Sequence, residues 1–99
     1  MTKSLGLPCC HLAPHVPDPR PGHLTMSWIP ARLLAERVRV RDYTCACAPT
    51  CYELCQSGGE YFIRRSRRID EEVVIEETHR TIYAKALVAW TRLLDGTSC

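Results

Sequence analysis

A chain of 99 residues is long enough for one small domain. Hydrophobic residues make up 45% of it and charges of both signs are present, which excludes a chain that is disordered by composition. A formal net charge of +2 does not dictate an anionic partner, and the apolar runs are too short to cross a bilayer.

The N-terminal residues lack the apolar core of a secretory signal, so the sequence predicts a protein of the cytoplasm, where thiols stay reduced. Seven cysteines, an odd number, cannot all pair within one molecule. They are expected to be metal ligands, reactive thiols or small buried apolar side chains.

Residues 1–25 are predicted to be a disordered tail, because five prolines remove backbone donors and few large apolar side chains are present. Residues 26–99 are predicted to form the folded domain, with Met26 as either a domain boundary or the true start. Cys9, Cys10, His11 and His15 resemble a metal cluster, but their Pro-rich context favours an accidental grouping.

The domain is expected to begin with a helical turn that Pro30 opens, through Ala31 to Glu36. Arg and Val then alternate from Arg37 to Arg41, which predicts a strand. Two further strand candidates flank a Gly-Gly hairpin turn, and a fourth follows them; they are Tyr52–Gln56, Tyr61–Arg65 and Glu72–Glu77.

The C-terminal part carries apolar residues at helical spacing and predicts a helix over residues 79–95. Thr78 is expected to cap its start, and Gly96 to end it in the left-handed conformation. The predicted fold class is α+β: a small antiparallel sheet of three to four strands with one C-terminal helix packed on one face.

Hairpin registers assign the two faces of the sheet. A turn at Gly58 and Gly59 places Cys55 opposite Phe62 and Glu53 opposite Arg64, and a turn at residues 48–50 places Tyr43 opposite Cys55. The face expected beneath the helix carries Val38, Val40, Ala46, Tyr52, Leu54, Tyr61 and Ile63. The outer face carries Arg37, Arg39, Arg41, Tyr43, Cys45, Cys47, Cys51, Cys55, Phe62 and Arg64. Asp42 falls on the first face, and a bulge near it would mix the two faces.

Four cysteines lie within eleven residues, Cys45, Cys47, Cys51 and Cys55, and they define the alternative zinc site. A strand would separate Cys51 from Cys55 by about 13 Å, too far for one ion. The favoured interpretation is therefore no cofactor, with thiols packed as small apolar side chains. A redox pair of Cys47 and Cys51 is the weakest option, because no C-x-x-C motif lowers a thiol pKa there.

The basic run Arg64 to Arg68 is expected to be neutralised by the acidic residues that follow it, from Asp70 to Glu77. The partner-binding residues are predicted on the outer face, where cations and aromatic rings mix as in sheets that bind nucleic acids. They are Arg37, Arg39, Arg41, Tyr43, Phe62 and Arg64. A solvated outer face is the simpler alternative.

No motif for catalysis is present, so the chain is predicted not to be an enzyme and to take no small-molecule substrate. The main hypothesis is a small non-catalytic interaction or regulatory module whose partner is a protein, including a second copy, or nucleic acid. The alternative hypothesis is a zinc-stabilised binding domain that uses the clustered cysteines.

Overall fold

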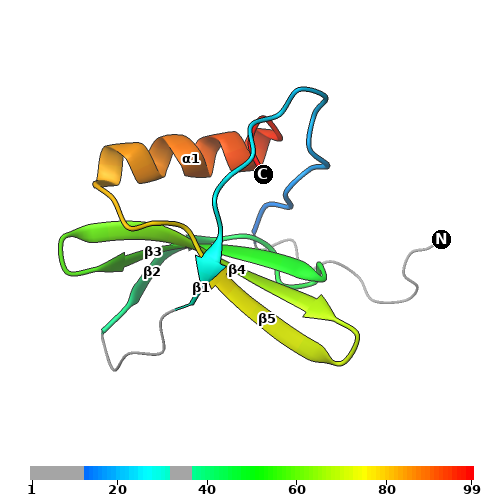
Figure 1. Ribbon diagram of the computed structural model, residues 1–99, viewed down its shortest axis with the longest axis horizontal. Coiled ribbons are helices and arrows are strands. Elements are labelled where there is room, and N and C mark those ends of the chain that lie inside the picture. The colour runs from blue at the N-terminus through cyan, green and yellow to red at the C-terminus, as the bar shows by residue number, and fades with distance from the viewer. Residues whose placement is uncertain (1–12, 32–36) are drawn as a thin grey trace.

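The computed structural model describes residues 13–31 and 37–99. In these residues an antiparallel sheet of five strands lies beneath one C-terminal helix, so the α+β class is confirmed and the sheet has more strands than the three to four expected. Figure 1 shows the helix across one face of the sheet. The elements are β1 (Ile29–Pro30), β2 (Arg39–Tyr43), β3 (Thr50–Ser57), β4 (Glu60–Ile69), β5 (Glu72–Glu77) and α1 (Tyr83–Asp95).

The additional strand is β1, which pairs with β5 at one edge in the order β1-β5-β4-β3-β2. Pro30 lies in this strand opposite Glu76 rather than opening a helix. An edge strand tolerates proline because one side of it needs no ladder donor. The expected helical turn falls largely on residues 32–36, outside the described residues.

The β3–β4 hairpin has the predicted register. Cys55 lies opposite Phe62 and Glu53 opposite Arg64, and the Glu53–Arg64 ion pair is 3.4 Å long. Gly58 in the turn has a φ of 61°, which glycine adopts at little cost. The stretch that contains Cys51 and Cys55 is therefore extended, as the hairpin signal predicts.

The β2–β3 pairing differs from the prediction. Tyr43 lies opposite Glu53 rather than Cys55, because a loop over residues 44–49 takes the place of the shorter expected turn. A shift of two residues leaves Tyr43 on the predicted outer face. A bulge between Val40 and Asp42 then turns Val40 onto the outer face opposite Cys55. The same bulge turns Arg39 onto the helix side opposite Gln56, so the predicted faces of both residues are wrong.

Asp42 faces the helix, as the alternation predicts, and its carboxylate accepts a hydrogen bond from the Trp90 indole N–H at 3.2 Å. This acceptor satisfies the polar atom of a ring that is only 3% exposed. The core around it is formed by Tyr52, Leu54, Ile63, Ala86, Trp90 and Leu93.

The outer face is also partly buried. Cys55 and Phe62 are 0% and 1% exposed, and the Arg80 guanidinium lies 4.1 Å from the centre of the Phe62 ring. Glu77 holds this guanidinium through an ion pair of 3.1 Å. Phe62 is therefore covered by a paired cation and does not present its ring to solvent.

The helix starts later than predicted. Ile82 precedes its first turn, and no side chain caps it. Thr78 instead accepts a hydrogen bond from the Ile63 N–H at 3.0 Å through its hydroxyl oxygen, which ties the end of β5 to β4. The predicted end is confirmed, because Gly96 has a φ of 81°.

Residues 13–25, the described part of the predicted tail, lie along the C-terminal end of α1 (Figure 1). The Arg20 N–H donates to the Gly96 carbonyl at 2.8 Å, and the Leu24 N–H to the Thr97 carbonyl at 2.9 Å. Val16 packs against the core. The segment turns at residues 21–22, where the His23 N–H donates to the Arg20 carbonyl at 3.0 Å, and residues 1–12 lie outside the described residues.

Candidate metal centre

The loop after β2 is anchored before its cysteines begin. The Thr44 N–H donates to the Tyr52 carbonyl at 2.9 Å, and the Tyr52 N–H donates to the Thr44 hydroxyl at 2.9 Å. The next residue, Cys45, donates its N–H to the Pro14 carbonyl at 2.8 Å. This last bond joins the loop to the N-terminal segment and brings His15 beside the cysteines.

His15, Cys45 and Cys47 form a group whose ligand atoms all lie within 4.8 Å of one another. The Cys45 and Cys47 sulfurs are 3.2 Å apart, and the Cys47 sulfur is 3.3 Å from Nε2 of His15. Cys45 is buried, whereas Cys47 and His15 are exposed. One anchored thiol and two accessible donors therefore converge from segments 30 residues apart in the sequence.

These distances suit zinc. Tetrahedral geometry with the usual zinc–sulfur and zinc–nitrogen bonds separates two sulfurs by about 3.8 Å and a sulfur from a nitrogen by about 3.6 Å. The observed separations of 3.2 and 3.3 Å are shorter than these by about 0.6 and 0.3 Å. An exposed loop accommodates such a change with small side-chain rotations. Two thiolates and an imidazole are also a donor set that zinc prefers.

The structure does not bring the four predicted cysteine ligands together. Among the described residues, Cys45 and Cys47 belong to the metal-binding group and Cys51 and Cys55 do not. The Cys51 thiol donates to the Ala48 carbonyl at 3.3 Å. Burial, then the neighbouring Cys45, raises the pKa of Cys51, while Arg68 opposes the rise. Burial alone dominates at Cys55, whose pKa rises to about 11.

His15 is the residue that the sequence reasoning missed. In the sequence it stands near Cys9, Cys10 and His11, all outside the described residues, and its Pro-rich context predicts no ligand role. No spacing rule links it to Cys45, because the two segments meet through tertiary contacts that include the backbone hydrogen bond from Cys45 to Pro14. His15 becomes a candidate ligand only in the folded structure, which brings it beside the loop that carries Cys45 and Cys47.

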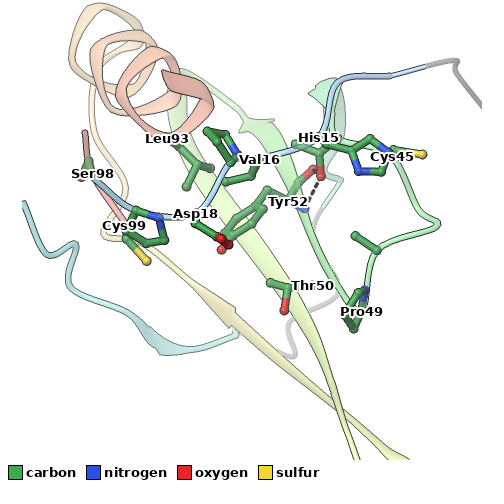
Figure 2. Close-up of a pocket in the computed structure, with 14 residues that line it drawn as sticks. His15, Val16, Asp18, Cys45, Pro49, Thr50, Tyr52, Leu93, Ser98 and Cys99 are labelled. Carbon is green, nitrogen blue, oxygen red and sulfur yellow. Dashed lines mark hydrogen bonds between the residues drawn. The ribbon is translucent and has the colours of Figure 1, made fainter. Parts of the chain in front are cut away.

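A cavity of about 280 Å³ lies beside this group. Figure 2 shows His15 and Cys45 at one side of it, Tyr52 in the middle and Cys99 at the opposite side. Val16 and Leu93 also line it, so its walls belong to the N-terminal segment, the sheet and the helix. The donor group therefore sits at the seam between these elements.

The predicted partner-binding residues are divided by the fold. Arg37, Arg39, Arg41 and Tyr43 are exposed along the edge strand β2 and its approach. Phe62 is buried, and Arg64 is paired with Glu53, so neither extends the predicted surface. In the basic run, Arg65 and Arg67 both contact Glu76, at 2.8 and 2.9 Å, in agreement with the neutralisation expected there.

Comparisons with protein families, with curated proteins and with solved structures found no match to this chain. In the described residues no helix has the length and apolar character needed to cross a membrane. Assignment of a function therefore rests on the chemistry of the side chains themselves.

Proposed function

We propose that this chain is a zinc-stabilised binding domain whose metal is held by His15, Cys45 and Cys47. The observation that carries the proposal is the convergence of three soft donors within 4.8 Å. The ion would clip the N-terminal segment to the loop between β2 and β3, at the seam beside the cavity. The proposed role is binding rather than catalysis.

A metal ion at this position would matter for the stability of the fold because the domain is small. A chain of this size buries a limited fraction of its unfolded surface, and metal binding is a common supplement to such a core. The ion would stabilise contacts between residues 14–15 and 45–47, which lie far apart in the sequence. The reducing cytoplasm that the sequence predicts would keep both thiols available as ligands.

A four-coordinate ion needs one donor more than this group supplies. Cys51 is the first candidate, because its thiol is close enough to Cys45 for the two to interact electrostatically. The N-terminal Cys9, Cys10 and His11 are the others, and they lie outside the described residues. The fourth donor is therefore to be identified by substituting each candidate residue and measuring the loss of metal binding.

The test is native mass spectrometry of the full chain, purified with zinc, combined with spectra of the cobalt-substituted protein. We expect one ion per chain and a thiolate-to-cobalt charge-transfer band. His15→Ala and Cys47→Ser should each lose the ion at equal free zinc. Both residues are exposed, so these variants should fold. Cys99→Ser, which also removes one thiol from the cavity wall, is the matched control and should keep the ion.

Zinc retained in full by both His15→Ala and Cys47→Ser would overturn the proposed ligand set. Absence of any ion from the unaltered chain, even with excess zinc, would overturn the function as a whole. A further loss of cobalt–thiolate intensity in Cys51→Ser, but not in Cys10→Ser, would identify Cys51 as the fourth donor.

A further inference from the structure

We propose that Arg37 and Arg39, at the start of the edge strand β2, form a site for the phosphates of a single-stranded nucleic acid. This inference is separate from the zinc proposal, because it uses other residues. On the helix side of the sheet, Arg39 pairs with Gln56 of β3, which places it at the hairpin end of the sheet, away from His15 and the 44–49 loop.

These arginines differ from several others in their surroundings. Within residues 13–31 and 37–99, Arg37, Arg39 and Arg41 make no ion pair with a carboxylate. By contrast, three arginines of β4 are paired, Arg64 with Glu53 and both Arg65 and Arg67 with Glu76, and Arg80 after β5 is paired with Glu77. The nearest acidic residue in the strand, Asp42, is directed to the Trp90 indole. Among residues 13–31 and 37–99, no carboxylate therefore pairs with the positive charge at the start of β2.

The same arginines line a concave surface. Arg37, Arg39, Gln56 and Gly58 surround a cavity of about 330 Å³. The described side chains that line it supply hydrogen-bond donors suited to an anionic oxygen: two guanidinium groups and the Gln56 amide, which also donates to the Gly58 carbonyl at 3.2 Å. Charged side chains on an edge strand also discourage aggregation, but that role requires no cavity. A hollow with two guanidinium groups and an amide fits an oxyanion.

The strand extends this site into a track. Arg37 lies two residues ahead of Arg39, the first residue of β2. An extended chain separates such residues by about 6.6 Å, a spacing similar to that of phosphates along an extended backbone. The bulge exposes Arg41 next to them, and the Tyr43 ring is 51% exposed at the far end of the strand. Tyr43 lies on the outer face and Arg39 on the helix side, so a nucleic acid that contacts both would follow the exposed edge of β2, with its phosphates at the arginines and a base stacked on the ring.

This chemistry favours nucleic acid over an acidic peptide. The planar guanidinium fork binds the oxygens of a phosphate in pairs, and aromatic rings contribute to binding because nucleobases stack on them. Carboxylates of a peptide would satisfy the arginines but would make no use of Tyr43. Phe62, the other ring expected at this surface, is buried under Arg80, so Tyr43 is the ring that the proposal uses.

The experiment measures binding of a fluorescent single-stranded oligonucleotide of mixed sequence by anisotropy, at several salt concentrations. Each phosphate contact adds about 0.7 to the slope of log affinity against log salt. The double variant Arg37→Gln/Arg39→Gln should weaken binding and reduce that slope by about 1.4. Arg68→Gln is the control for charge, because Arg68 is exposed near the opposite end of the β3–β4 ladder, where it follows the Thr50–Arg67 pair. This variant should change the slope by less than about 0.7, which is the contribution of one phosphate contact.

Three results would overturn the proposal. One is no binding at low salt. Another is an equal loss in the Arg68→Gln protein, which would indicate a response to net charge alone. The third is equal affinity for a glutamate-rich peptide of the same net charge, together with no effect of Tyr43→Ala, which would indicate an acidic protein partner. Because none of these variants touches His15, Cys45 or Cys47, the zinc content reports separately on the metal proposal.

Discussion

At the scale of single residues, the cysteines of one short stretch have different chemistry because the fold gives them different surroundings. Cys47 is exposed beside an imidazole, whereas Cys55, eight residues later, is 0% exposed on the outer face of the sheet. Burial disfavours the thiolate and so keeps Cys55 in the form of a small apolar side chain. The composition of the stretch alone does not distinguish these two outcomes.

Alkylation should therefore discriminate between these thiols. In protein treated with a chelator, we expect iodoacetamide to modify Cys47 near neutral pH, because it is exposed, and to leave Cys55 intact. Labelling of Cys55 should rise only as the pH approaches its pKa of about 11. Peptide mapping by mass spectrometry measures both. Equal labelling of the two thiols near neutral pH would show that the outer face is not packed as described.

The raised pKa of Cys55 also makes the free energy of unfolding depend on pH. The Cys55 pKa is raised from 9.0 to about 11 in the folded state, so the unfolded chain releases this proton first as the pH rises. The contribution of Cys55 to the free energy of unfolding is therefore complete below about pH 9 and is lost between that pH and 11. Cys55→Ala should lessen the decline in this range, as measured by urea denaturation at successive pH values.

At the scale of elements, two glycines allow a matched test of how the N-terminal segment docks on α1. Gly58 and Gly96 both have positive φ, but a Cβ at Gly58 would meet nothing within 4 Å. At Gly96 it would lie 3.2 Å from the Asp18 carbonyl oxygen and 3.3 Å from Cγ of Pro17. Alanine at either site should cost about 1–2 kcal/mol from backbone strain. Gly96→Ala should cost more and should raise proteolysis within residues 13–25, because the segment must move away. Equal costs at the two sites would argue that this segment is not docked.

Elements with a local signal could be predicted, and those fixed by distant contacts could not. The Gly58–Gly59 turn set the β3–β4 register, and Gly96 set the end of the helix, because each acts on its neighbours in sequence. The only local signal for the bulge before Asp42 was a charged residue on the face expected beneath the helix, and the hydrogen bond from the Trp90 indole to Asp42 comes from a distant element. The pairing of Pro30 with Glu76 is likewise a long-range contact. Of the candidate metal site, the sequence predicted Cys45 and Cys47 as ligands under the zinc alternative, but not His15.

At the scale of the whole molecule, the proposed ion should act as a stabiliser of measurable size. Free zinc at 100 times its dissociation constant would add about 2.7 kcal/mol to the free energy of unfolding. For a domain of this size, that corresponds to a rise in Tm of roughly 10–20 °C. Calorimetry with and without zinc measures the shift, with Cys47→Ser as a control that should show none.

The zinc effect should weaken as the pH falls, because protons compete for both thiolates and for the imidazole. A Tm shift that is equal in the Cys47→Ser protein would assign the stabilisation to ions bound elsewhere on the chain. A Tm shift that persists unchanged in acid would contradict thiolate ligation.

The contacts of the N-terminal segment become possible at different times as the chain is synthesised. Once the chain has been made as far as Tyr52, both backbone anchors of the Cys45 loop are present, and His15 is already available. The bridge from Leu24 to Ser98 and the bond from Met26 to Cys99 wait until the last of these residues leaves the ribosome. The three donors and both anchors of their loop thus precede α1 in the chain, and their contacts can begin to form while the C-terminal residues are still being made.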